Sequence, residues 1–317
     1  MNEPAVRPLV WASLRPVGSD CEKLRRALAG LREKDAAFSV DEEDVDGRVI
    51  IRATNELHLE DICDRLVREH AVYVKAGAPK VIYLETIRDA SNGVGKFINQ
   101  SGGRGHYAHV VIRIEPNPTK GYELVSETRE VSIPGKYLRP IDEGIRYALK
   151  VGVAGHEMTD IRVILCDGSY HETDSDDGAF ESAGFIALKE AVRESGCVLL
   201  EPVVSLEVAV PQELAATVIA DLKSRRADIT GIEGASANKQ MIRAIVRLAE
   251  IIGYAADLRL RTGERATCSA SLLRYRQVQD LPPAGDDLIG VTANKPKKPK
   301  PKSGAEAVEP PWLESNC

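Results

Sequence analysis

The residues best suited to bind a ligand form a glycine-rich segment just before a long apolar strand pattern. Gly102, Gly103 and Gly105 permit positive φ angles and a close approach of the backbone to a bulky partner. Arg104 adds a planar guanidinium group that matches the geometry of phosphate oxygens, and His106 adds an imidazole. This combination indicates a loop that presents its backbone and one cation to a phosphate-bearing ligand.

A second polar segment, residues 167–177, follows the apolar strand predicted over residues 161–166. It contributes four further candidate binding residues, which are Ser169, Tyr170, His171 and Asp174. If both strands belong to one sheet, the two polar segments lie side by side at one of its ends, together with His109. The sequence leaves open the alternative that these histidines are solvated loop residues without a ligand.

Patterns for nucleotide binding are present only in part. Residues 103–108 fit G-x-G-x-x-A, but a dinucleotide-binding turn must be followed by a helix, and here a strand pattern follows. Gly95 and Lys96 are followed by Phe97, so they do not form a phosphate-binding loop of the GxxxxGK[ST] type. We therefore expect no cofactor.

The polar side chains do not form a reactive set either. His106 and His109 have no nearby cysteine or third histidine that would complete a zinc site. Ser169, His171 and Asp174 are too close together in one loop to reach the geometry of a hydrolytic triad. The sequence predicts no catalytic residue and no metal.

Composition narrows the class of protein. The chain has 317 residues, of which 43% are hydrophobic and 28% charged, and no apolar run approaches the ~20 residues that cross a bilayer. The N-terminus lacks the pattern of a signal peptide, and the six cysteines are scattered, so we expect a cytoplasmic protein with reduced thiols. A net charge of -6 argues against a protein that coats DNA, but it permits a shaped RNA site.

The order of the predicted elements divides the chain into three folded domains. Residues 1–79 and residues 201–280 each show the order strand, helix, strand, strand, helix, strand, which is the ferredoxin-like βαββαβ pattern. Residues 80–200 carry longer strands and two helices. His58 lies in the first turn of a predicted helix, and we expect its role to be structural. The fold class is therefore α+β, with two related domains on either side of a central α/β domain.

The end of the chain has a different character. Residues 281–317 are rich in lysine and proline without apolar periodicity, so they cannot bury a core and are expected to be disordered. Solvation alone accounts for such a tail. Its lysines would also allow a sequence-independent contact with RNA phosphates.

Over residues 9–275 the chain resembles the C-terminal part of bacterial elongation factor G, the translocase. Long motifs in the order of that family carry the resemblance: ELHLEDICDRLVRE (56–69), YLETIR (83–88), QSGGRGHYAHVVI (100–112), IPGKYLRPIDEGI (133–145), DGSYHETDS (167–175), LLEPV (199–203) and GYAADLR (253–259).

The resemblance implies that the three domains are the third, fourth and fifth domains of that family. The fourth would be an elongated module whose tip loops touch transfer RNA and messenger RNA in the decoding region of the small ribosomal subunit. It places residues 102–106 and 169–175 at these tips, with His171 beside the codon–anticodon helix. It also makes Arg225 and Arg226 candidates of second rank for RNA contact. We give His109 the same rank.

The sequence departs from the family pattern in several places. Asn55, Ala108 and Glu264 stand where glycine is usual, and His106 replaces a common glutamine. The family's nucleotide-binding domain has no counterpart in these residues. These departures suggest a diverged paralogue, with a truncated gene as the alternative.

The resemblance leads to a main expectation and two alternatives. The main one is a non-enzymatic protein that binds the ribosome through rRNA, tRNA and mRNA, without contact to DNA or membranes. The first alternative is one half of a split translocase whose GTPase is a separate chain, and the second is a nonfunctional fragment.

Overall fold

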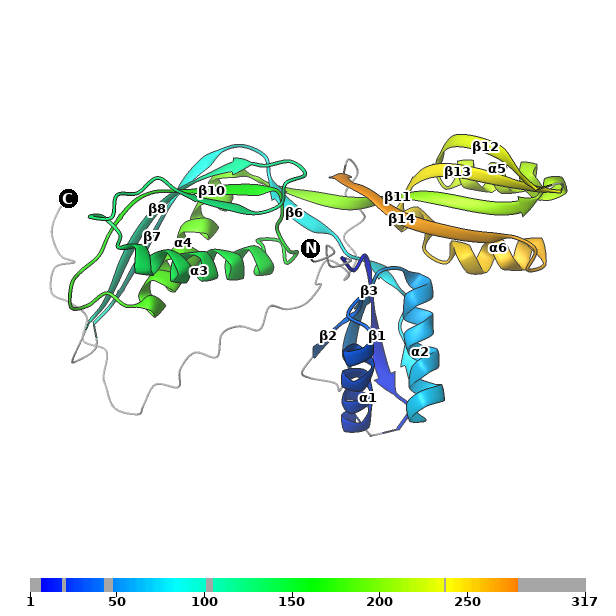
Figure 1. Cartoon of the computed structure of the whole chain (residues 1–317), viewed down its shortest axis with the longest axis horizontal. Coiled ribbons are helices and arrows are strands. Elements are labelled where there is room, and N and C mark those ends of the chain that lie inside the picture. The colour runs from blue at the N-terminus through cyan, green and yellow to red at the C-terminus, as the bar shows by residue number, and fades with distance from the viewer. Residues whose placement is uncertain (1–6, 19–20, 43–47, 101–104, 237, 279–317) are drawn as a thin grey trace, which may run out of the picture.

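The computed structural model describes residues 7–18, 21–42, 48–100, 105–236 and 238–278. Within these residues the strands form three sheets, and each sheet carries two α-helices. We call the resulting bodies the N-terminal unit (β1–β5, α1 and α2), the middle unit (β7–β10, α3 and α4) and the C-terminal unit (β6, β11–β14, α5 and α6). Figure 1 shows the middle and C-terminal units at the two ends of an extended molecule, with the N-terminal unit projecting from between them.

The N-terminal unit has the predicted ferredoxin-like topology. Its elements are β1 (Val10–Pro16), α1 (Cys21–Lys34), β2 (Ser39–Glu42), β3 (Val49–Ala53), α2 (Glu56–His70), β4 (Val74–Ala76) and β5 (Lys80–Val81). The strand order is β2-β3-β1-β4, and β5 also pairs with β1. Helix α2 begins after Asn55, whose side chain accepts a hydrogen bond from the backbone N–H of His58, and ends at Ala71 in the left-handed conformation.

The C-terminal unit repeats this topology. Its elements are β6 (Leu84–Ile87), β11 (Cys197–Pro211), α5 (Ala215–Ser224), β12 (Asp228–Ser236), β13 (Lys239–Arg247), α6 (Tyr254–Thr262) and β14 (Thr267–Gln277). The order β12-β13-β11-β14 corresponds to that of the first sheet, and β6 adds to the start of β11. Strand β11 is continuous across residues 200 and 201, where the sequence suggested a domain boundary.

A 3-10 turn precedes each helix of the C-terminal unit. The turn η2 (Gln212–Leu214) follows Pro211 and leads directly into α5. The turn η3 (Leu248–Ile251) is separated from α6 by Gly253, which has φ 78°. This left-handed conformation is one that glycine adopts without strain.

The N-terminal and C-terminal units share one hydrophobic cluster, which includes Leu14 and Leu28 from the former and Val208 and Tyr254 from the latter. A hydrogen bond of 2.9 Å from the Gly253 N–H to Glu56 Oε2 also joins the two units. These contacts dock the repeats against each other.

The middle unit contains the sheet that carries the predicted ligand-binding segments. Its elements are β7 (Ser91–Asn99), β8 (His106–Pro116), β9 (Glu123–Ser126), α3 (Leu138–Val151), β10 (Ile161–Ser169) and α4 (Asp177–Ser195). The order is β7-β8-β10-β9, with β9 parallel to β10 and the other pairs antiparallel. This arrangement confirms the predicted fold class of α+β.

Glycines bring the two helices of the middle unit into close contact with each other and with the sheet. A Cβ atom at Gly144 of α3 would lie 2.0 Å from the Glu181 carbonyl oxygen of α4, and one at Gly95 of β7 would lie 1.8 Å from the Ala183 carbonyl oxygen. Only glycine permits this spacing. The sheet end that carries the polar segments is therefore supported by a tightly packed body.

No helix in the part of the chain that the structure describes combines the length and the apolar character needed to cross a membrane.

Candidate nucleic-acid interface

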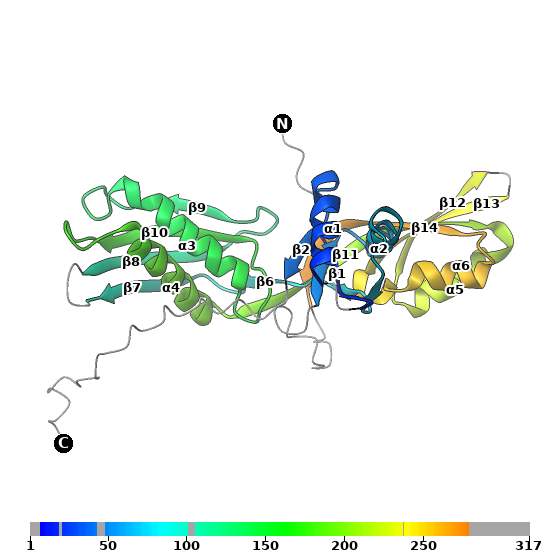
Figure 2. The ribbon, with the colours of Figure 1, turned by 90° about the horizontal axis from the view of Figure 1, so that it is seen from below.

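The two predicted polar segments meet at the free end of the middle sheet. Strand β7 ends at Asn99, β8 begins at His106, and β10 ends at Ser169, which pairs with His109 of β8. We call the residues at this end, 98–100, 105–107 and 169–176, the tip. Figure 2 shows that the tip lies at the end of the middle unit that points away from the C-terminal unit.

The second polar segment is shorter than the range 167–177 expected from the sequence. The apolar pattern stops at Cys166, but β10 continues through an irregularity between Leu165 and Asp167 and pairs with β8 as far as Ser169. Helix α4 begins at Asp177, with Asp176 as its N-cap. The turn itself therefore spans residues 170–176.

Backbone hydrogen bonds hold this turn against the start of β8. The Tyr107 N–H donates to the Asp174 carbonyl oxygen at 2.8 Å, and Ser175 Oγ donates to the Tyr107 carbonyl oxygen at 2.6 Å. Ser175 Oγ also accepts from the His171 N–H at 2.9 Å. Because Ser175 is buried, it acts as the structural centre of the tip.

The tip surrounds an open hollow of about 130 Å³. Residues from both polar segments line it: Ile98, Asn99, Gln100, Gly105, His106, Tyr107, His171 and Asp174. Sequence reasoning singled out Gly105, His106, His171 and Asp174 but not the end of β7. The sequence could have indicated that the end of β7 belongs to the site, because the polar residues Asn99 and Gln100 lie just before the glycine-rich segment.

Each tip histidine faces a carboxylate. His106 Nδ1 contacts Asp176 Oδ2, and His171 Nδ1 lies 3.3 Å from Asp174 Oδ2. The described tip segments contain no lysine or arginine, and Glu172 adds a further negative charge. An RNA phosphate would therefore need a cation from an adjacent segment.

A third segment, which the sequence analysis missed, lies next to the tip and carries two basic residues, Arg129 and Lys136, together with two acidic ones, Glu127 and Glu130. Because β9 runs parallel to β10, the loop after Ser126 leaves the sheet at the tip end, and the Tyr137 hydroxyl donates to the Ser175 carbonyl oxygen at 3.1 Å. Arg129 and Lys136 are exposed in this loop. Their place could be found only from the strand order, because the local sequence indicates no more than a turn before a helix.

The remaining candidates differ in their availability. Gly102, Gly103 and Arg104 lie outside the described residues. Ser169 Oγ lies 2.8 Å from the Tyr107 hydroxyl and 3.2 Å from His109 Nδ1, so His109 is tied into the sheet rather than presented at the tip.

The two second-rank arginines have different surroundings. The Arg225 guanidinium lies 5.0 Å from the Tyr254 ring centroid and donates to Asp221 at 3.2 Å and to Asp257 at 2.7 Å. This environment is that of a structural residue. The side chain of Arg226 is 70% exposed, so it remains accessible to a ligand.

The tip shows no arrangement for hydrolysis. His171 Nδ1 contacts Thr173 Oγ1 at 3.0 Å, while Ser169 Oγ contacts the hydroxyl of Tyr107 and His109. Ser169, His171 and Asp174 therefore do not form a chain of hydrogen bonds. Across the described residues, no group of three or more His, Cys, Asp or Glu side chains is placed to hold a metal ion.

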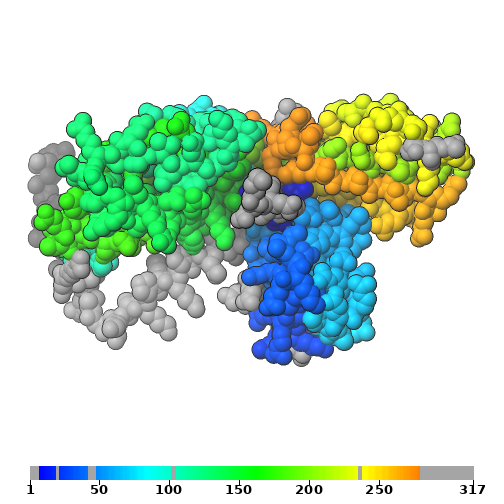
Figure 3. Space-filling model, viewed as in Figure 1, coloured from blue at the N-terminus to red at the C-terminus, as the bar shows by residue number. Residues whose placement is uncertain are grey.

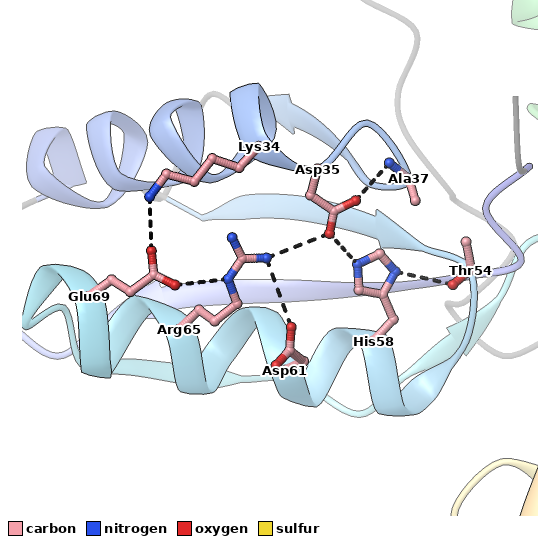
Figure 4. Close-up of polar contacts among 8 residues, drawn as sticks. All are labelled: Lys34, Asp35, Ala37, Thr54, His58, Asp61, Arg65 and Glu69. Atoms are coloured by element: carbon pink, nitrogen blue, oxygen red, sulfur yellow. Dashed lines mark hydrogen bonds and ion pairs between the residues drawn. The ribbon is translucent and has the colours of Figure 1, made fainter.

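A second polar cluster lies in the N-terminal unit (Figure 4). His58 Nε2 lies 2.9 Å from Asp35 Oδ2, and His58 Nδ1 lies 3.1 Å from Thr54 Oγ1. Burial raises the pKa of Asp35, but hydrogen bonds from the Ala37 N–H and from His58 outweigh it and leave the pKa below its ordinary value. Arg65 also pairs with Asp35, so the cluster joins α1 to α2. This is the structural role expected for His58.

Comparisons with known proteins agree with the three-unit architecture. The family model "Elongation Factor G, domain III" matches residues 7–78, "Elongation factor G, domain IV" matches residues 79–196, and "Elongation factor G C-terminus" matches residues 198–284. None of these three is a model of a GTPase domain. The N-terminal, middle and C-terminal units thus correspond to consecutive domains of one family, except that β6, which pairs with β11, falls within the domain IV match.

A solved structure gives the same result. A crystal structure of a protein from Thermus thermophilus matches with a TM-score of 0.70 and 35% sequence identity, and the match covers 88% of the chain. The chain spans 42% of the length of that relative.

Proposed function

The chain belongs to the elongation factor G family, and on that premise we propose that it is a cytoplasmic translation factor that binds the ribosome. The tip of the middle unit contacts transfer RNA, messenger RNA and ribosomal RNA at the site where such factors bind. In this proposal the chain acts by binding RNA and does not hydrolyse GTP by itself.

The observation that supports this proposal most directly is the joint hollow of the tip. Residues 105–107 and 171–175 are far apart in sequence, yet they are hydrogen-bonded to each other and line the same 130 Å³ hollow. Imidazole, amide and hydroxyl groups gathered on an exposed edge can recognise folded RNA through its shape, phosphates and ribose hydroxyls.

The residues around the hollow differ in charge, so we assign them different contacts with the RNA. Arg104 and the exposed Arg129 and Lys136 neutralise phosphates, while His106 and His171 contact ribose or base edges. Gly102, Gly103 and Gly105 allow close approach of the RNA backbone. Ser169, Tyr170 and Asp174 shape the turn, and Arg226 makes a second contact from the C-terminal unit.

Sedimentation with ribosomes over a salt series tests this proposal. Changing Arg104→Ala should weaken binding and reduce the slope of log K against log salt by about one, because one phosphate contact is lost. His171→Ala should weaken binding without changing that slope, since its proposed contact is with ribose or a base edge and not with a phosphate.

Two matched variants complete the experiment. Glu172→Gln removes a negative charge from the same turn and should strengthen binding. Arg26→Ala removes an arginine of α1 whose side chain is 80% exposed and lies 3.6 Å from Glu22, and it should leave binding unchanged. Equal affinities for the wild-type protein, Arg104→Ala and His171→Ala at every salt concentration would refute the tip as the RNA-binding surface.

A second candidate function follows from the size of the solved relative, of which the chain spans 42%. In that case the chain is the ribosome-binding half of a split translocase, and a separate GTPase supplies the energy. GTP turnover should then be absent with the isolated chain and ribosomes, and should appear when the partner GTPase is added.

A further inference from the structure

A buried carboxylate lies where the middle unit joins the rest of the molecule. Glu85 in β6 is 0% exposed. Its Oε1 atom accepts from the backbone N–H groups of Ala154 at 2.9 Å and His156 at 2.8 Å, and its Oε2 atom accepts from the Val153 N–H at 2.8 Å. Converging backbone amides of this kind form a concave anion site, so they compensate the burial of the charge.

These amides belong to a different unit from Glu85. Residues 152–159, which we call the junction loop, connect α3 to β10 in the middle unit, whereas β6 pairs with β11 in the C-terminal sheet. Two backbone hydrogen bonds run alongside, from the Glu85 N–H to the Glu157 carbonyl oxygen at 2.9 Å and from the Thr159 N–H to the Glu85 carbonyl oxygen at 2.8 Å.

The N-terminal unit reaches the same loop. Arg7 pairs with Glu157 at 2.7 Å, and its guanidinium lies 6.0 Å from the ring centroid of Tyr275 in β14. All three units therefore make contacts around the junction loop. The space-filling view shows the three units coming together near the middle of the molecule (Figure 3).

Two residues next to the Glu85 carboxylate allow the junction loop to enclose it and add a hydrogen bond to it. Gly152 has φ 65°, and a Cβ there would lie 1.9 Å from the His156 carbonyl oxygen and 2.9 Å from Glu85 Oε1, so the loop can close around the carboxylate only with glycine. Cys197 Sγ donates to Glu85 Oε2 at 3.3 Å. Burial and the adjacent carboxylate raise the pKa of Cys197 to about 12, which keeps this donor protonated.

The connections between the units explain why a side-chain contact matters here. The chain enters the middle unit after β6 and leaves it into β11, and these two strands lie side by side. Two adjacent strands form a narrow ribbon, about which a body can rotate or bend. The junction loop provides a third attachment, because it binds β6 of this ribbon directly through Glu85.

We propose that Glu85 is a positioning residue that fixes the direction of the middle unit, and with it the place of the tip, relative to the C-terminal unit. The carboxylate holds the junction loop against β6 as the third attachment point and thereby prevents the middle unit from bending or rotating relative to the β6–β11 ribbon. This role does not depend on what the tip binds.

Distances between spin labels in the free protein test the proposal. One label is placed at Glu181, near the start of α4, and the other at Leu260 of α6, which is 84% exposed; attachment through noncanonical amino acids leaves the native cysteines intact. Glu85→Gln keeps the side-chain shape but turns an amide N–H toward the Val153 N–H. We expect the distribution of distances between the labels to broaden or shift.

Two controls separate positioning from loss of folding. Labels at Lys120 and Glu181, both in the middle unit, should give the same distance in wild type and Glu85→Gln. Asp221→Asn changes a carboxylate whose side chain is 13% exposed and which pairs with Arg225 and Arg261 inside the C-terminal unit, so it should leave the distance between units unchanged.

Amide hydrogen exchange of the wild-type protein provides a measurement that needs no variant. The N–H groups of Val153, Ala154 and His156 should be protected, although the exposed Val153 and Ala154 lie outside helices and strands. An unchanged distance distribution in Glu85→Gln, or exchange of these amides as fast as in a free loop, would overturn the proposal.

Discussion

His156 shows at the scale of a single residue how the junction constrains side chains. Its backbone N–H donates to Glu85, its ring packs 6.0 Å from the Tyr83 ring, and its Nε2 atom is buried without a hydrogen-bond partner among the described residues. Burial lowers the pKa of His156, although the Glu85 carboxylate acts in the opposite direction. The folded protein therefore favours the neutral imidazole.

This shift predicts a loss of stability in mild acid. Below the unfolded-state pKa of about 6.5, the unfolded chain binds a proton that the folded chain resists, so the free energy of unfolding falls as the pH falls. The effect is absent above that pH, where both states are neutral. Thermal unfolding over a pH series measures it.

The matched variant is His156→Gln, which cannot titrate. Its melting temperature should fall less than that of wild type on acidification. Parallel curves for wild type and His156→Gln would show that this group does not govern the acid response.

Sequence patterns identified some residue roles and not others. The position of His58 after Asn55 sufficed to predict a structural histidine at the start of a helix. Glu85 gave no such signal, because its partners lie about 70 residues later and use backbone N–H groups, which every residue but proline offers. The family resemblance made Arg225 a second-rank candidate for RNA contact, but Asp257 and Tyr254 of the next helix contact its guanidinium group.

At the scale of elements, the close packing of α3, α4 and β7 keeps the tip in place. The contacts at Gly144 and Gly95 leave no room for a side chain against the backbone of α4. Periodicity predicted both helices, because their apolar positions repeat at helical spacing. It could not predict how closely they pack, nor the short strand β9, whose pairing with β10 depends on the chain returning through α3.

Gly144→Ala should therefore destabilise the middle unit by about 1–3 kcal/mol or more, since its Cβ would overlap the Glu181 carbonyl. Gly178→Ala is the matched control in the first turn of α4, where the nearest atom to a new Cβ is 3.6 Å away, and its effect should be neutral or slightly stabilising. Urea unfolding measures both. Equal stabilities of the two variants would contradict close helix packing as the support of the tip.

At the scale of the whole molecule, the internal repeat and the extended arrangement have different origins. The repeated ferredoxin-like order was predictable, because each unit has its own periodic apolar faces, although the two units bury them in one shared cluster. The directions of the units were not, because they depend on a few contacts between distant residues, such as Arg7 with Glu157 and Glu56 with Gly253. The middle and C-terminal units lie at opposite ends of the molecule (Figure 1).

The most direct test of the account is a photo-crosslink from the tip to RNA in the complex with ribosomes. A photoreactive residue replaces Ile98, which is 58% exposed and lines the hollow, and a control replaces Tyr73 in the N-terminal unit, which is 64% exposed. The account predicts crosslinks from position 98 to small-subunit ribosomal RNA of the decoding region, to transfer RNA or to messenger RNA, and none of these from position 73. Crosslinks from position 98 to none of these RNAs, in a sample where the protein sediments with ribosomes, would contradict it.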